Sequence, residues 1–126
     1  MGEWEKPTWA VIHLFALYID AAVPLSEYVM FYQTMGKTLP CSKCRRHFAD
    51  TITRLGVPRD HSDLFGWTVK LHNAVNRFLR KREYTESEAR EFWEKYKNHR
   101  NSAKYMVIIG AFIVGLAIGY VITKWK

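Results

Sequence analysis

The chain contains 126 residues, of which 48% are hydrophobic, 15% aromatic and 25% charged, and its formal net charge is +7. Abundant aromatic residues exclude a disordered chain, and two cysteines are too few for a fold of this length that is stabilised mainly by disulfides. The positive charge alone would suit nucleic acid, but basic residues are concentrated on both sides of an apolar C-terminal stretch, so we expect a membrane and no nucleic acid as partner.

Two helices are predicted before residue 40. Apolar residues recur at three- and four-residue steps from Thr8 to about Ala22, and Pro7 suits the first turn of a helix. After Pro24 the same spacing continues up to a break at Gly36–Pro40. The apolar positions are Trp9, Ile12, Ala16 and Ile19 in the first helix, and Leu25, Tyr28, Val29, Tyr32 and Met35 in the second.

Two more helices follow. The third should begin near Pro40 and end at Gly56, a residue suited to a helix C-terminus. The fourth should be capped by Ser62 or Asp63 and run to about Lys81. The third carries Cys41, Cys44, Phe48, Ile52 and Leu55 on one side, and the fourth should turn Leu64, Trp67, Leu71, Val75 and Phe78 inward.

A short fifth helix is predicted by the capping-box sequence from Thr85 to Glu88, and its apolar residues are Ala89, Phe92, Trp93 and Tyr96. No segment alternates apolar and polar residues for long enough to predict a strand. We therefore expect an all-α domain.

The stretch Tyr105–Thr123 is predicted to be a transmembrane helix. It contains 19 residues without a charge, and at ~1.5 Å per residue it reaches roughly 28 Å, close to the ~30 Å thickness of the hydrocarbon core. No cleaved signal is visible at the N-terminus, and the larger basic cluster precedes the stretch. We expect residues 1–102 to form a domain that faces the cytosol, and residues 103–126 to form a tail anchor. Gly115 and Gly119 could let two such helices pack closely, or lipid could simply tolerate them.

The sequence Cys41-Ser42-Lys43-Cys44 is the clearest chemical motif. At a helix N-terminus the helix dipole favours thiolates, and Lys43 and Arg45 add positive charge. This composition is typical of a redox-active disulfide. Half of a zinc site and two buried structural cysteines are the alternatives, but no second cysteine pair supplies the other zinc ligands.

Polar residues on the first and fourth helices form two further candidate groups. His72 and Asn76 are four residues apart and share a helical face beside an apolar stripe, with Asn73 one turn from Asn76. Trp9 and His13 share a face of the first helix in the same way. Taken singly, such residues are more often polar residues at the edge of a core than ligands of a cofactor.

Taken together, W-x-x-x-H, P-C-x-x-C and W-x-x-x-x-H-N-x-V-N-x-x-L-x-K resemble the Erv/ALR family of FAD-dependent sulfhydryl oxidases. The resemblance covers about Thr8 to Tyr84, and it is greatest to minimal single-domain forms such as those of large cytoplasmic DNA viruses. It implies a four-helix bundle with a short fifth helix that holds FAD beside the C-x-x-C motif.

The same resemblance implies roles for individual residues. Cys41 would be the sulfur that a substrate attacks, and Cys44 the sulfur next to the flavin. Further FAD contacts would come from Trp9, His13 and Tyr18 on the first helix, from Trp67, His72, Asn73, Asn76 and Lys81 on the fourth, and from Tyr84 beyond it.

The implied reaction is thiol oxidation, in which electrons pass from a substrate dithiol through the Cys41–Cys44 disulfide to FAD and then to O2, giving H2O2. Many relatives carry a second, shuttling cysteine pair, and this chain has only two cysteines. We therefore expect a thioredoxin-like or C-x-x-C dithiol protein to react directly with Cys41.

Several implications concern assembly and location. Family members commonly form helix-packed homodimers, and a viral relative would act at host cytoplasmic membranes or at the virion membrane. Arg80 and Arg82 stand where the family usually has Gly and Pro, so the adjoining loop is expected to differ. A tail-anchored helical adaptor with a structural or metal-binding C-x-x-C is the competing hypothesis.

Overall fold

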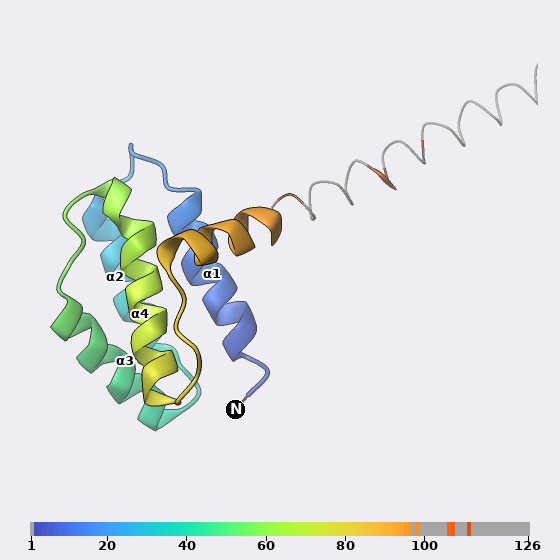
Figure 1. The fold of residues 1–126 in the computed structure, drawn as a ribbon. Helices are drawn as coiled ribbons and strands as arrows, with labels where there is room; N and C mark the ends of the chain where they lie inside the picture. The colour runs from blue at the N-terminus through green and yellow to red at the C-terminus, as the bar shows by residue number, and fades with distance from the viewer. Residues whose placement is uncertain (1, 97, 99–105, 108–110, 112–126) are drawn as a thin grey trace, which may run out of the picture. The chain divides into compact units, whose positions relative to one another are not determined.

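The computed structural model describes residues 2–96, 98, 106, 107 and 111. The chain divides into two compact units, Met1–Arg90 and Glu91–Lys126. The first unit contains the helices α1 (Glu5–Leu17), α2 (Leu25–Thr38), α3 (Ser42–Leu55) and α4 (Leu64–Phe78), with a short 3-10 helix, η1 (His61–Asp63), before α4 (Figure 1). Residues 86–96 are also helical. No strand occurs among the described residues, which confirms the all-α prediction.

The four long helices pack as a bundle around one core. α4 packs against both α1 and α3, and α2 packs on α3 (Figure 1). Ile12, Tyr32, Leu64 and Leu71 are completely buried, and burial of each such apolar side chain stabilises the fold by about 1.5–3 kcal/mol. The Tyr32 hydroxyl donates a hydrogen bond to the Ile12 carbonyl at 3.0 Å, which joins α2 to α1.

The first helix is shifted toward the N-terminus relative to its prediction. Pro7 lies in the first turn as expected, where a backbone N–H has no helical partner. The helix ends at Leu17, so the predicted continuation to about Ala22 is wrong. Asp20 explains the early end, because its carboxylate accepts a hydrogen bond from the Ala22 N–H at 2.9 Å and stabilises a local turn instead.

The predicted break at Gly36–Pro40 is confirmed, although Gly36 itself lies inside the helix. Gly36 is buried inside α2, and a Cβ atom there would lie 2.3 Å from the ring of Phe48 on α3. The glycine therefore permits close packing of α2 on α3 rather than ending α2. The helix ends at Thr38 because the next residue, Leu39, precedes Pro40 and is extended, with ψ of 139°.

The third helix agrees with its prediction, and the fourth begins where it was predicted: α4 starts at Leu64, and Asp63 occupies its N-cap position. Gly56 follows α3 with a φ of +68°, which a glycine adopts without steric cost. The Asp63 side chain makes no capping hydrogen bond at this position. Ser62 and Asp63 also lie within η1, where Asp60 accepts hydrogen bonds from their backbone N–H groups at 2.8 and 3.1 Å. Asp60 is the capping residue of η1 because its side chain reaches both free N–H groups.

The fourth helix ends at Phe78, three residues before the predicted Lys81. Arg80 adopts a left-handed conformation with φ of +55°. The Arg80 N–H donates to the Arg77 carbonyl at 3.1 Å, and the Lys81 N–H donates to the Asn76 carbonyl at 2.8 Å. These bonds form a Schellman motif in which a glycine is normally favoured, so Arg80 occupies a strained position.

The capping box before residues 86–96 is confirmed. The Thr85 N–H donates to the Glu88 carboxylate at 2.8 Å, and the Glu88 N–H donates to the Thr85 hydroxyl at 3.2 Å.

The predicted transmembrane span falls almost entirely outside the described residues, as do the domain boundary after residue 102 and the Gly115–Gly119 pair. Among the helices that are described, none has the length and apolar character needed to cross a membrane.

Candidate redox site

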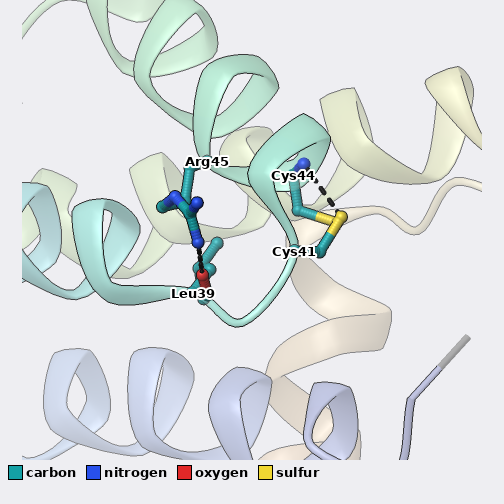
Figure 2. Close-up of a disulfide and its surroundings, with 4 residues drawn as sticks. All are labelled: Leu39, Cys41, Cys44 and Arg45. Atoms are coloured by element: carbon teal, nitrogen blue, oxygen red, sulfur yellow. Dashed lines mark hydrogen bonds between the residues drawn. A yellow bond between two sulfur atoms is a disulfide. The ribbon is translucent and has the colours of Figure 1, made fainter.

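Cys41 and Cys44 form a disulfide at the N-terminus of α3 (Figure 2). Cys41 is the N-cap residue, and its sulfur accepts a hydrogen bond from the Cys44 N–H at 3.1 Å. The free N–H groups and the positive end of the helix dipole stabilise negative charge at this position. The first turn of α3 therefore favours the thiolate that forms when the disulfide opens.

The charge around the disulfide is positive. The first turn of α3 contains no acidic residue. The Lys43 ammonium lies 5.2 Å from the centroid of the Phe78 ring on α4. Arg45 Nη1 donates a hydrogen bond to the Leu39 carbonyl, which ties the start of α3 to the preceding loop (Figure 2). Both cations strengthen the field that favours a thiolate.

A cavity of about 310 Å³ opens beside the disulfide. Its walls come from the N-terminal segment, α1, the start of α3 and the end of α4: Gly2, Trp4, Glu5, Thr8, Trp9, Leu39, Cys41, Lys43, Cys44, His47, Phe48, Val75, Phe78 and Leu79. Phe78 was predicted to face the core, but its side chain is 47% exposed and forms part of this wall. Most of the lining is apolar or aromatic, which suits a flat conjugated ring.

Two histidines join α1 to α4 next to this cavity. His13 Nε2 lies 2.9 Å from His72 Nδ1, and His13 Nδ1 lies 3.1 Å from the hydroxyl of Thr68. The Trp9 ring stacks on His72 with a centroid separation of 3.8 Å and an interplanar angle of 6°. Burial, with a contribution from His72, lowers the pKa of His13 to about 3. Burial and the nearby Lys81 ammonium lower the pKa of His72 to about 4.

The remaining predicted residues near the end of α4 hold the chain that follows it. The side-chain amide of Asn73 donates to the Tyr84 carbonyl at 2.6 Å and accepts from the Tyr84 N–H at 2.9 Å. Asn76 is buried, and the Lys81 ammonium lies 3.9 Å from the Glu5 carboxylate. These contacts keep the loop after α4 close to the start of α1.

Two predicted cofactor residues lie apart from the disulfide. Trp67 is buried, and its indole N–H donates to the carbonyl of Gly56 at 2.8 Å. Gly56 follows the last turn of α3, whereas Cys41 caps the first, so Trp67 lies at the other end of this helix. Tyr18 follows the last residue of α1 and is 52% exposed. Cofactor binding by either residue stays a prediction.

Sequence reasoning did not assign Trp4, His47 or Thr68 to the cofactor site. Trp4 and His47 line the cavity, and Thr68 contacts His13. Helical spacing held a signal for two of them, because His47 is three residues after Cys44 and Thr68 is four residues before His72. Trp4 precedes α1, so no helical spacing relates it to the site.

The fold and the site define a thiol–disulfide redox protein, because a disulfide at a helix N-terminus forms one wall of an aromatic cavity in a helical bundle. The Erv1 / Alr family profile matches residues 6–97. The chain belongs to the Erv1 / Alr family, which confirms the resemblance inferred from its motifs.

Curated relatives come from large DNA viruses. The chain is 28% identical over 102 residues to the FAD-linked sulfhydryl oxidase of African swine fever virus, in an alignment that covers 78% of this chain and 80% of the relative. It is 29% identical over 111 residues to a probable FAD-linked sulfhydryl oxidase of Acanthamoeba polyphaga mimivirus, covering 82% and 77% of the two chains.

The residues around the cavity fit a flavin. Trp9, Phe48 and Phe78 provide aromatic surfaces, and the Cys41–Cys44 disulfide forms part of the same wall. A volume of about 310 Å³ lies within the usual range for small-ligand sites, about 300–1,000 Å³, although at its lower end. The cavity thus suits the ring of the cofactor rather than the whole dinucleotide, whose diphosphate would suit cations such as Lys81 at the end of α4.

Proposed function

We propose that this protein forms disulfide bonds in a partner dithiol and is a flavin-linked thiol oxidase with FAD as its cofactor. The observation that carries the proposal is the Cys41–Cys44 disulfide in the wall of an aromatic cavity. Family membership and the names of the viral relatives support both the enzyme class and the cofactor.

Disulfide exchange at Cys41 begins the reaction. A substrate thiolate attacks Cys41 Sγ, the Cys41–Cys44 bond breaks, and Cys44 leaves as a thiolate. A second substrate thiolate then attacks the mixed disulfide at the substrate sulfur, which releases the oxidised substrate and leaves a thiolate on Cys41. The substrate loses two electrons, and the two cysteines gain them. The helix N-terminus, Lys43 and Arg45 stabilise the thiolates.

The chemistry that a bound FAD would supply is acceptance of the electron pair from the reduced cysteines and its transfer to O2, giving H2O2. Trp9, His13, His72 and Lys81 would hold FAD, together with the aromatic cavity walls. The protein's own contribution would be to hold the Cys41–Cys44 disulfide in the wall of the cavity that would receive the flavin ring.

The electron donor follows from the cysteine count. With only Cys41 and Cys44 in the chain, no second pair can carry electrons to the site. A thioredoxin-like or C-x-x-C protein would therefore react directly with Cys41. If the purified enzyme oxidised many unrelated reduced proteins as fast as any single partner, this proposal would be wrong.

Membrane attachment is a further proposal. The uncharged stretch of residues 105–123 and its basic flanks support a tail anchor, with the N-terminal domain facing the cytosol at host cytoplasmic membranes or the virion membrane. Alkaline carbonate extraction tests it, because an anchored protein stays in the membrane pellet. Release into the supernatant would contradict it.

We also propose a homodimer. Val11, Phe15 and Met30 are exposed apolar side chains on α1 and α2, and the Phe15 ring stacks on Phe31 at 5.2 Å. A second copy packed on these helices would bury them. A monomeric mass in analytical ultracentrifugation at micromolar concentration would contradict this arrangement.

The oxidase is tested with the visible spectrum of the full-length purified protein, before and after addition of dithiothreitol in air. Flavin absorption should bleach and recover while peroxide accumulates. Cys41→Ser and Cys44→Ser should each abolish turnover and retain flavin, whereas Ser42→Ala, in the same helical turn, should retain both. A colourless protein that FAD does not reconstitute would favour the adaptor hypothesis instead.

A further inference from the structure

Thr68 begins a directional chain of hydrogen bonds that crosses from α4 to α1 and back. Its side chain is completely buried. Its hydroxyl donates to the Phe65 carbonyl, one turn earlier in α4, at 2.7 Å. A carbonyl oxygen can only accept, and the Thr68 oxygen lies closer to the Phe65 carbonyl, at 2.7 Å, than to His13 Nδ1, at 3.1 Å, so we assign the single hydroxyl proton of Thr68 to the bond with Phe65.

The Thr68 oxygen must therefore accept the second bond, from His13. His13 Nδ1 lies 3.1 Å from this oxygen. Since the hydroxyl has no proton left to donate, His13 Nδ1 must carry the ring proton. Thr68 thus determines which nitrogen of His13 is protonated.

The tautomer of His13 in turn determines the tautomer of His72. Desolvation keeps the pKa of both rings far below 7, so both are neutral at physiological pH. A neutral His13 ring protonated at Nδ1 has a bare Nε2, and this nitrogen lies 2.9 Å from His72 Nδ1. His72 must donate from Nδ1, and its own Nε2 is then left without a proton.

We propose that Thr68 is a positioning residue that sets the tautomers of His13 and His72, so that His72 meets the cofactor as a hydrogen-bond acceptor. The cofactor half of this inference rests on the proposed function. An unprotonated nitrogen is repelled by a phosphate oxygen and pairs with a hydroxyl or amino group. The Trp9 ring, stacked on His72, fixes the plane in which that lone pair lies.

The proposal is tested by ¹⁵N NMR of the imidazole nitrogens in the FAD-loaded, full-length protein. The chain has five histidines, and substitution of His47, His61 and His99 leaves the two rings of interest. Both His13 and His72 should be protonated at Nδ1 and bare at Nε2. A proton on His72 Nε2 would overturn the proposal.

Three variants separate tautomer control from simple packing. Thr68→Val keeps the shape but removes the acceptor, so the fraction of His72 protonated at Nδ1 should fall and the Kd for FAD should rise about tenfold. Thr68→Ser should restore both. Thr51→Val is the control, because Thr51 is equally buried and its hydroxyl donates to the His47 carbonyl of its own helix at 2.7 Å, but it accepts from Arg54 rather than from a histidine.

The readouts distinguish the possible failures. If Thr68→Val leaves the tautomers unchanged, or if Thr51→Val shifts them equally, Thr68 has only a packing role. If the protein binds no FAD, the proposed function fails, while the tautomers of the flavin-free protein still test the role of Thr68.

Discussion

The paired rings of buried His13 and partly buried His72 predict a loss of stability in mild acid. The folded protein holds the pKa of His13 at about 3 and that of His72 at about 4, whereas the ordinary value is 6.5. Above pH 6.5 the folded and unfolded chains are both neutral at these sites. As the pH falls below 6.5, the two histidines become protonated in the unfolded chain but stay neutral in the folded chain, so the free energy of unfolding decreases.

The magnitude follows from the width of the pH window. Each pH unit below 6.5 lowers the free energy of unfolding by about 1.4 kcal/mol per ring. Between pH 6.5 and pH 5 the loss is therefore about 2 kcal/mol for each histidine and about 4 kcal/mol for the pair. His47 adds a loss in the same direction, because burial also lowers its pKa. Protonation of the carboxylates whose pKa values are lowered decreases the free energy of unfolding mainly below about pH 4.5, which lies outside this window.

Urea unfolding at pH 7 and pH 5, followed by tryptophan fluorescence at one saturating FAD concentration, measures the loss. His72→Asn keeps a donor near the position of Nδ1 but cannot bind a proton, so it should remove about 2 kcal/mol of the pH dependence.

Ile52→Val is the control for a change in stability alone. Ile52 is buried in α3 and carries no titratable group, so its truncation should cost about 0.5–1.5 kcal/mol equally at both pH values. Equal stability of the wild-type protein at pH 7 and pH 5 would refute the reasoning, as would an unchanged pH dependence in His72→Asn.

Two more predictions concern positions where the backbone conformation or close packing favours glycine. Arg80→Gly should raise the free energy of unfolding by about 1 kcal/mol, because the left-handed conformation at φ +55° strains any residue except glycine; an unchanged or lower urea midpoint would contradict this. Gly36→Ala should destabilise the protein by about 1–3 kcal/mol, because its Cβ would lie 2.3 Å from the buried Phe48 ring. Gly66→Ala is the matched control in α4: its Cβ would meet only the flexible carboxylate of Glu86, so thermal unfolding should show no loss, and equal losses at both glycines would refute the packing argument.

Local sequence patterns predicted the helices and the chemical motif well. Gly56 ends α3, Thr85 and Glu88 form the capping box, and Cys41 caps the helix that carries Cys44. Each of these features depends on residues within four positions of one another. The geometry of a single helical turn therefore determines them, whatever the rest of the chain does.

Errors in the predicted helix ends have local causes that hydrophobic spacing does not contain. Asp20 stabilises a turn that stops α1. Asp63 is the N-cap residue of α4 as predicted, but the side chain that accepts the capping hydrogen bonds is that of Asp60, at η1. Gly36 was placed at the start of the predicted break at Gly36–Pro40 because glycine disfavours helices, but contact with Phe48 requires it inside α2. A contact between two helices thus outweighed the propensity of one residue.

The sequence by itself determined the all-α class, the family motifs and the position of the cysteines at a helix N-terminus. Only the tertiary structure decided that Phe78 forms a wall of the cavity, that Trp67 lies at the far end of α3, and that Thr68 reaches His13, 55 residues away. Spacing along a helix shows which residues share a face. Which faces meet depends on packing between distant segments, and that packing places the two histidines and Thr68 in one hydrogen-bonded chain.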